Sequence, residues 1–200
     1  MTNRKARGVT VITVTIFFLL TWTTLSAAED NFVELPMPQE FSPALQQDGS
    51  PLYVTAASIE NTFRKYNPKL KKFYYNKDIK QFIVPGREWL KSLLLTYDSF
   101  ISYTGVRAKQ DAWDCENYSS MLDNLITVRL WRAGYLDTRA AVGWVRVVAN
   151  NVWAGYQSPV HAVMFTVTDK GIFIIEPQNG QYINLSAYPN RGTIEEVYLF

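Results

Sequence analysis

The order of hydrophobic and polar positions changes its period partway along the chain, and this change predicts helices first and strands afterwards. Apolar residues recur at helical spacing in the segments 56–66 and 85–103 and again after Cys115. Shorter apolar runs then predict strands at residues 139–148, 160–167, 172–175, 182–185 and 194–199, and one earlier strand is predicted at 79–84. Helices followed by antiparallel strands indicate an α+β fold.

The helix that starts near Cys115 has recognisable signals at both ends. Its buried stripe has apolar residues at i, i+3, i+4, i+7 and i+8, namely Tyr118, Met121, Leu122, Leu125 and Ile126. Asp111 or Asp114 can serve as the N-cap, and Gly134 is placed to cap the C-terminus. The thiol is therefore expected at the helix start or within its first turn.

Residues 1–28 are typical of a secretory signal peptide. Basic residues precede the uncharged run 9–25, and small residues follow it at 26–28. The uncharged run is also just long enough for an uncleaved membrane anchor. The expected organisation is therefore a signal peptide or anchor, then an extended, proline-rich lead-in at 29–52, and one domain at 53–200.

The charge balance changes once the N-terminal segment is set aside. Removing residues 1–28 leaves 17 basic and 18 acidic residues, so the +2 net charge of the full chain becomes −1. No nucleic-acid partner is expected from this balance, and a membrane is expected as a partner only if the N-terminal segment is retained. The folded part is expected outside the cytoplasm, in the periplasm or secreted.

The chain contains one cysteine and one histidine, Cys115 and His161. A lone cysteine cannot form an internal disulfide, so it is either a small buried hydrophobe or a reactive thiol. The helix dipole and a neighbouring imidazolium both favour the thiolate form of a thiol, which is the nucleophile. His161 opens a predicted strand and could supply the imidazolium.

A third residue completes the pattern. Glu176 ends the next predicted strand, and the tight turn predicted at Asp169-Lys170-Gly171 would return the chain beside His161. A carboxylate on the second ring nitrogen fixes the orientation of an imidazole. The sequence therefore predicts a catalytic triad of Cys115, His161 and Glu176.

These segments resemble the transglutaminase-like superfamily, which belongs to the papain-like group of thiol enzymes. The matching segments are Asp114-Cys115-Glu116-Asn117-Tyr118, the strand 140–145, His161-Ala162-Val163-Met164-Phe165 and Ile175-Glu176-Pro177. The first is also similar to bacterial transglutaminase-like cysteine proteinases, which act in the periplasm. The resemblance covers roughly residues 110–180 and implies a papain/transglutaminase-like core, with the nucleophile helix packed on an antiparallel sheet. The chain departs from the family in having Glu176 where Asp is usual and Trp113 where a small residue is common.

Further site residues are predicted around this triad. The backbone N–H of Cys115 is a natural oxyanion donor, and Gln110 and Trp113 are candidates for a second donor. Trp153 and Tyr156 precede His161 and are candidates to line the substrate cleft.

Metal binding is weakly indicated. The resemblance raises calcium near Asp114 and Glu116, although acidic residues at a helix start also simply favour the dipole. No other cofactor is expected, because one cysteine and one histidine fall short of the usual zinc ligand set.

Two functions from different classes remain open. The first is an exported cysteine hydrolase or acyltransferase that acts on amide bonds in a protein, a peptide or peptidoglycan. The second is a catalytically inactive domain of the same fold that acts as a binding or scaffold module. A membrane-tethered assembly protein is a further possibility if the N-terminal segment is retained.

Overall fold

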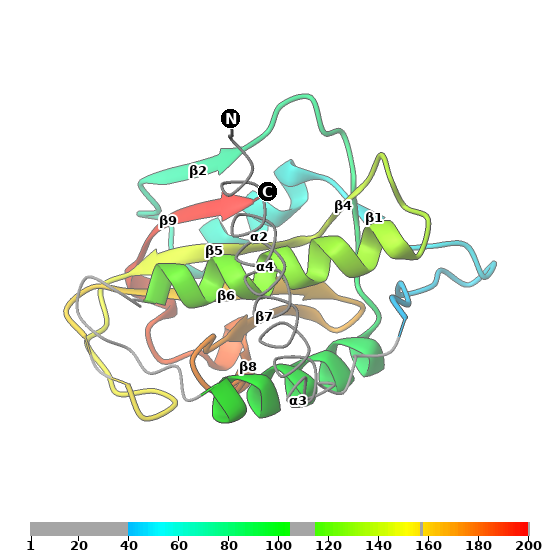
Figure 1. Ribbon diagram of the computed structural model, residues 1–200. Coiled ribbons are helices and arrows are strands. Elements are labelled where there is room, and N and C mark those ends of the chain that lie inside the picture. The colour runs from blue at the N-terminus through cyan, green and yellow to red at the C-terminus, as the bar shows by residue number, and fades with distance from the viewer. Residues whose placement is uncertain (1–39, 105–114, 157, 200) are drawn as a thin grey trace, which may run out of the picture. The chain divides into compact units, whose positions relative to one another are not determined.

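Strands form two sheets, and helices pack on both faces of the larger one (Figure 1). The computed structural model describes residues 40–104, 115–156 and 158–199. Within them the helices are α2 (Ala56–Tyr66), α3 (Arg87–Thr104) and α4 (Cys115–Arg132). The strands are β1 (Tyr53–Val54), β2 (Lys72–Tyr75), β3 (Phe82–Ile83), β4 (Arg139–Ala140), β5 (Val142–Val147), β6 (His161–Thr168), β7 (Gly171–Ile175), β8 (Tyr182–Asn184) and β9 (Ile194–Leu199). The predicted α+β fold class is confirmed at this level.

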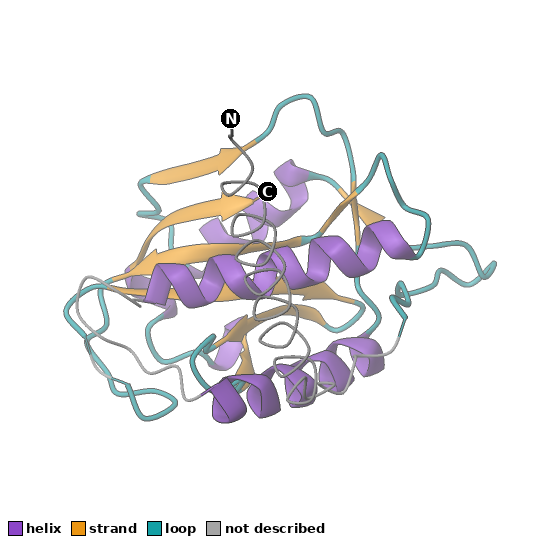
Figure 2. Ribbon diagram, viewed as in Figure 1, coloured by secondary structure: helices purple, strands orange, loops and turns teal. Residues whose placement is uncertain are grey.

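The larger sheet has six strands in the order β2-β9-β5-β6-β7-β8. All neighbours are antiparallel except β2 and β9, which run parallel at one edge. The smaller sheet has the order β1-β3-β4. Figure 2 shows these strands in orange, with the helices in purple.

Two apolar clusters hold the layers together. On one face Ile59 and Phe63 of α2 pack with sheet residues that include Val145 and Phe165. On the other face α3 and α4 pack with sheet residues that include Met164 and Ile175. All eight residues of β6 are buried because its two faces are covered by different helices. The histidine strand is therefore a rigid element in the middle of the fold.

The predicted signals at helix ends are partly visible. Gly134 has φ 90°, its N–H donates to Trp131 O at 3.0 Å, and the Tyr135 N–H donates to Leu130 O at 3.2 Å. This pair of bonds is a Schellman motif, so the predicted glycine cap of α4 is confirmed. The predicted N-caps Asp111 and Asp114 lie outside the described residues.

The strand predictions need two corrections. The run 139–148 is not one strand, because Ala141 N–H donates to Ile83 O of the small sheet while Ala141 O accepts from Val167 N–H of the large sheet. The chain therefore changes sheet at Ala141, and β4 and β5 are separate. The edge strands β1 and β2 were not predicted, and the run 79–84 contains a strand only at β3.

The described part of the predicted lead-in, residues 40–52, contacts the domain. Phe41 is buried edge-on against Trp89, at 4.8 Å between ring centres, and against Tyr135, at 5.6 Å. None of the described helices is long and apolar enough to cross a bilayer. The predicted signal peptide, residues 1–28, lies outside the described part of the chain.

Candidate active site

Three elements bring the predicted triad residues to one place. Cys115 is the first residue of α4, His161 is the first residue of β6, and Glu176 follows β7 directly. The backbone N–H of Ala162 donates to Cys115 Sγ at 3.2 Å, so the start of the helix abuts the start of the strand. Cys115 is half-buried.

His161 and Glu176 form a buried pair. Their Nε2 and Oε2 atoms lie 2.7 Å apart. Strands β6 and β7 are paired from Thr168–Gly171 to Met164–Ile175, so Glu176 follows the last pair while His161 lies three residues before Met164. The two side chains are thus offset along the strands. A glutamate can span this offset because its side chain is one methylene longer than that of aspartate.

The charge on His161 follows from its neighbours. Burial opposes the positive charge, but hydrogen bonds and charge interactions with Cys115 and Glu176 outweigh it and raise the pKa of His161 to about 9. Nε2 is the ring nitrogen that faces Glu176. Cys115 and Glu176 therefore both favour the charged form of the imidazole.

A tight turn holds the carboxylate in place. Glu176 is completely inaccessible to solvent, and its Oε1 accepts the Gln178 N–H at 3.2 Å. Its carbonyl accepts the Gly180 N–H at 2.8 Å, and its own N–H donates to Gln181 O at 2.8 Å. Gly180 has φ 68°, a conformation that favours glycine. The orientation of Glu176 is therefore set by the backbone of the turn at residues 176–181.

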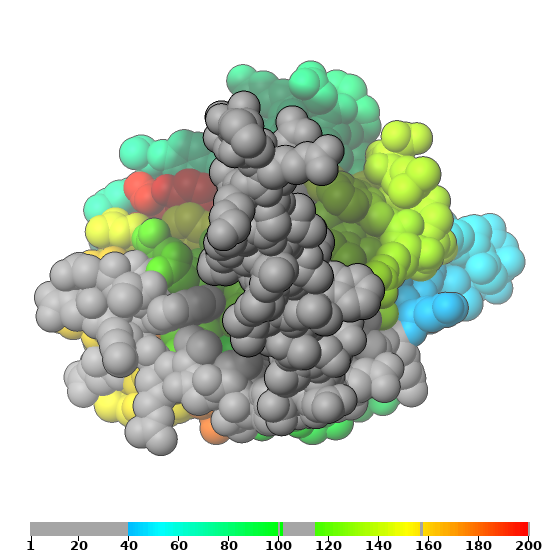
Figure 3. Space-filling model, viewed as in Figure 1, coloured from blue at the N-terminus to red at the C-terminus, as the bar shows by residue number. Residues whose placement is uncertain are grey.

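A second turn places Tyr156 beside the imidazole. Trp153 and Tyr156 exchange backbone hydrogen bonds of 3.2 and 2.9 Å across Ala154 (φ 52°) and Gly155 (φ 83°). The side chain of Asn179 donates to Ala154 O at 3.0 Å and so ties this turn to the glutamate turn. The Tyr156 ring lies nearly parallel to the His161 ring, with centres 6.2 Å apart. The segment 148–156, yellow in Figure 3, lies at the surface.

The other predicted cleft residue, Trp153, contacts the core. Its ring packs edge-on against buried Tyr188, with ring centres 5.1 Å apart, and it is only partly buried. Of the two predicted cleft aromatics, Tyr156 is thus the one beside the histidine.

Two hydrogen bonds to backbone carbonyls hold the first turn of α4 in place. Tyr97 of α3 donates its hydroxyl to Tyr118 O at 3.2 Å, and Ser119 Oγ donates to Cys115 O at 2.8 Å. Both tyrosines are almost completely buried. The first turn of the helix, and with it the thiol, is therefore fixed relative to α3.

Several predicted site residues cannot be placed. The candidate oxyanion residues Gln110 and Trp113 and the candidate calcium ligand Asp114 lie outside the described residues. Glu116 is described and its side chain is exposed. No group of three or more His, Cys, Asp or Glu side chains suitable for a metal ion occurs in the described part of the chain.

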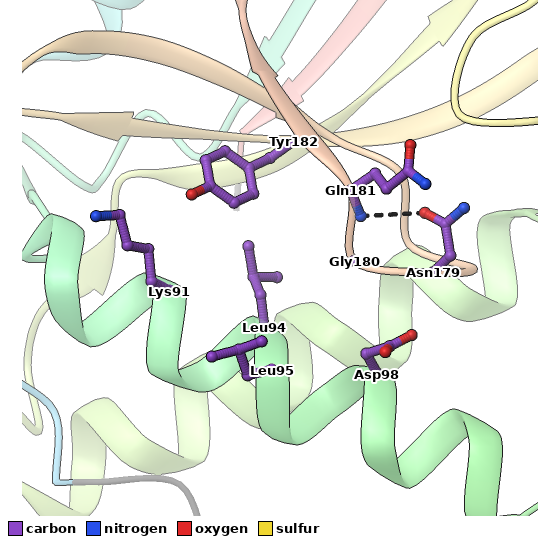
Figure 4. A pocket seen from close by; sticks show the side chains of 8 residues that line it. All are labelled: Lys91, Leu94, Leu95, Asp98, Asn179, Gly180, Gln181 and Tyr182. Carbon is purple, nitrogen blue, oxygen red and sulfur yellow. Dashed lines mark hydrogen bonds between the residues drawn. The ribbon is translucent and has the colours of Figure 1, made fainter.

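A cavity of about 440 Å³ lies between α3 and residues 179–182 (Figure 4). Its walls are α3, through Lys91, Leu94, Leu95 and Asp98, and residues 179–182. None of the triad residues lines it. The cavity therefore borders the support of Glu176 and not the reacting groups.

Three contacts at the site could not be predicted from residue types. Two of them come from backbone donors: the Ala162 N–H contacts the sulfur and the Gln178 N–H contacts the carboxylate. Every residue type except proline has such an N–H, so the residue type does not reveal it. Asn179 directly follows the Glu176-Pro177-Gln178 segment, but an asparagine in a turn is ordinary. Only the positions of the neighbouring elements show what these groups contact.

Comparisons with known proteins give limited similarity. No family model and no curated protein matches the chain. Among solved structures, it is similar to a complex of PSL1a with E64, with a TM-score of 0.47 and 16% identity over 74% of this chain and 51% of that one. It is also similar to Polyporus squamosus lectin bound to a human-type influenza-binding epitope, with a TM-score of 0.45 and 16% identity over 66% of this chain and 45% of that one. The chain thus spans about half the length of the solved chains it matches.

Proposed function

We propose that the chain is an exported cysteine hydrolase or acyltransferase that cleaves amide bonds through Cys115, His161 and Glu176. The observation that carries the proposal is the convergence of the three residues from α4, β6 and the end of β7, with 2.7 Å between His161 Nε2 and Glu176 Oε2 and 3.2 Å between Cys115 Sγ and Ala162 N. A helix-start thiol on an antiparallel sheet that carries the histidine also fits the papain-like core which the sequence resembles.

The first chemical step starts from the ion pair of Cys115 and His161. A thiolate on Cys115 beside an imidazolium on His161 attacks the carbonyl carbon of the substrate amide, forming a carbon–sulfur bond. His161 then transfers a ring proton to the departing amine nitrogen as the carbon–nitrogen bond breaks. Glu176 keeps the ring oriented and stabilises its positive charge throughout. The product of this half-reaction is a thioester on Cys115.

The second step decides between hydrolysis and transfer. The neutral imidazole accepts a proton from water or from an amine, which attacks the thioester and releases Cys115. The Cys115 N–H, at the helix start, serves as one donor to the oxyanion formed in each step. Gln110 and Trp113 remain the predicted candidates for a second donor.

The substrate class follows from the predicted export of the chain. A protein, a peptide or a peptidoglycan amide is the substrate expected outside the cytoplasm. The Tyr156 ring, parallel to His161, forms one wall beside the reacting groups.

The test compares the mature chain with its Cys115→Ala variant on two substrates. Purified peptidoglycan and a labelled unfolded protein are incubated with each form, and newly released amino groups are measured. We expect release from one substrate by the wild type and none by the variant. Equal release by both forms would overturn the proposal. If neither form releases amines and the wild type forms no thioester with p-nitrophenyl acetate, the domain is the inactive binding module.

A further inference from the structure

A second cavity of about 440 Å³ lies along α4, away from the thiol. Its polar lining comes from three places: Asp123, Asn124 and Thr127 of α4, Arg139 of β4, and Asn76 after β2. Asp123 is eight residues after Cys115, or about 12 Å along a helix axis. This cavity is therefore separate from the candidate active site, and nothing in the proposed reaction uses it.

Asp123 is a half-buried carboxylate in the lining of this cavity. It forms no hydrogen bond or ion pair with any residue in the described ranges. Burial raises its pKa to about 6, and the charge of Arg139 offsets part of this rise. No buried side-chain oxygen in the described residues lacks a hydrogen-bond partner, so the Asp123 oxygens keep contact with solvent through the cavity. The carboxylate thus has its full accepting capacity available to a ligand.

Arg139 supplies the opposite charge on the same cavity. Its guanidinium lies 5.7 Å from the centre of the Trp131 ring, which also lines the cavity. Within the described part of the chain it forms no ion pair with Asp123, although the two charges interact across the space. A ligand placed between them can pair with both.

The remaining walls divide into neutral polar and apolar groups. The Asn124 and Thr127 side chains form no hydrogen bond with another described residue, while the Asn76 Oδ1 accepts the Asp78 N–H at 3.0 Å. Ile79 and Val142 contribute apolar surface beside the Trp131 ring. The cavity therefore offers one anion, one cation, spare amide and hydroxyl groups, and an apolar side.

We propose that this cavity binds a free α-amino acid with an apolar side chain, with its ammonium group on Asp123 and its carboxylate on Arg139. Charge-assisted hydrogen bonds are stronger than those to neutral groups, so a zwitterion complements the two opposite charges better than a neutral polyol does. The volume lies within the usual range of small-molecule sites. The binding requires neither Cys115 nor amide cleavage, and so goes beyond the proposed function.

The test is calorimetric titration of the Cys115→Ala chain with L-leucine. We expect a saturable isotherm with a Kd of about 1 mM or tighter, and no binding of the uncharged analogue N-acetyl-L-leucine amide. Asp123→Asn and Arg139→Gln should each weaken leucine binding at least about tenfold. Asp169→Asn, which changes an exposed acid away from the cavity, is the matched control and should leave the Kd unchanged.

Each other outcome overturns the proposal. Leucine that gives no saturable heat, or that binds as well as its uncharged analogue, excludes recognition of a zwitterion. A cavity that binds glucose in preference to leucine takes a polyol instead. Thermal unfolding of each variant identifies misfolding, and the pair Asp123→Asn and Arg139→Lys provides a second, conservative comparison. Because the Cys115→Ala background cannot use the thiol, failure here is independent of failure of the proposed function.

Discussion

At the scale of single residues, His161 determines the chemistry of the candidate site. Its ring is 7% exposed, yet it lies between the Glu176 carboxylate and the Cys115 sulfur, which stabilise its positive charge. Because the chain has only one histidine, the ring resonances of His161 can be followed in solution without assignment. Its protonation is therefore directly measurable.

The first prediction concerns the titration of this ring. In a proton NMR titration His161 should titrate near pH 9, and Glu176→Gln should lower its pKa by at least about one unit because a neutral amide stabilises imidazolium less. The aspartate variant, Glu176→Asp, should fall between the two because its shorter side chain reaches the ring less well. A wild-type value at or below the ordinary 6.5 would contradict the buried ion pair.

The second prediction concerns the pH dependence of stability. The pKa of His161 is raised on folding, so its contribution is fully present below about pH 6.5 and is lost as the pH rises through about 9. The free energy of unfolding should therefore fall by on the order of 2–3 kcal/mol between pH 6 and pH 10 through this group. His161→Gln should remove most of that slope in denaturant titrations. An equal slope in both forms would show that other groups cause it.

The proximity of His161 and Glu176 could be predicted from sequence because it depends on local rules. Gly171 has φ 103°, and the tight turn it permits makes β6 and β7 a hairpin that brings Glu176 back towards His161. The Ala162 N–H and the tie from Asn179 to Ala154 could not be predicted, because they depend on where α4 and the turn at 153–156 pack. These contacts belong to tertiary structure.

At the scale of elements, long-range pairing determines the strands more than the intrinsic preferences of their residues do. The short strand β2 was missed because it pairs with β9, at the far end of the sequence, and its residues are mostly exposed. The division of 139–148 was missed because both halves are apolar and only the hydrogen bonds of Ala141 separate them. Sequence periodicity predicts which face of an element is buried, whereas long-range pairing determines which sheet a strand joins.

The third prediction tests the packing of β5. A side chain at Gly143 would overlap the carbonyl oxygen of Tyr198 on β9 and come within 2.8 Å of the Phe165 ring. Gly143→Ala should therefore lower the free energy of unfolding by about 2–3 kcal/mol or more, because backbone and a buried ring cannot both shift. Gly192→Ala, where no atom lies within 4 Å, is the matched control and should change stability little. A Gly143→Ala chain as stable as the control would contradict this packing.

At the scale of the whole molecule, two unrelated sites share α4. The helix carries Cys115 at its start and Asp123 about two turns later, and both faces of the sheet are covered. The proposed amino-acid cavity and the candidate active site can therefore be altered independently. Asp123→Asn should leave the reactivity of Cys115 within about twofold of the wild type, since substitutions without shared contacts are nearly additive.

The most direct test of the central claim is the rate at which iodoacetamide alkylates Cys115 in the folded chain. The chain has one cysteine, so the mass increase reports this thiol alone. At pH 7 the wild type should be alkylated at least about tenfold faster than His161→Gln, because the imidazolium stabilises the reactive thiolate. Equal rates in the two forms, or a thiol that stays unmodified until the protein unfolds, would contradict the assignment of Cys115 and His161 as a catalytic pair.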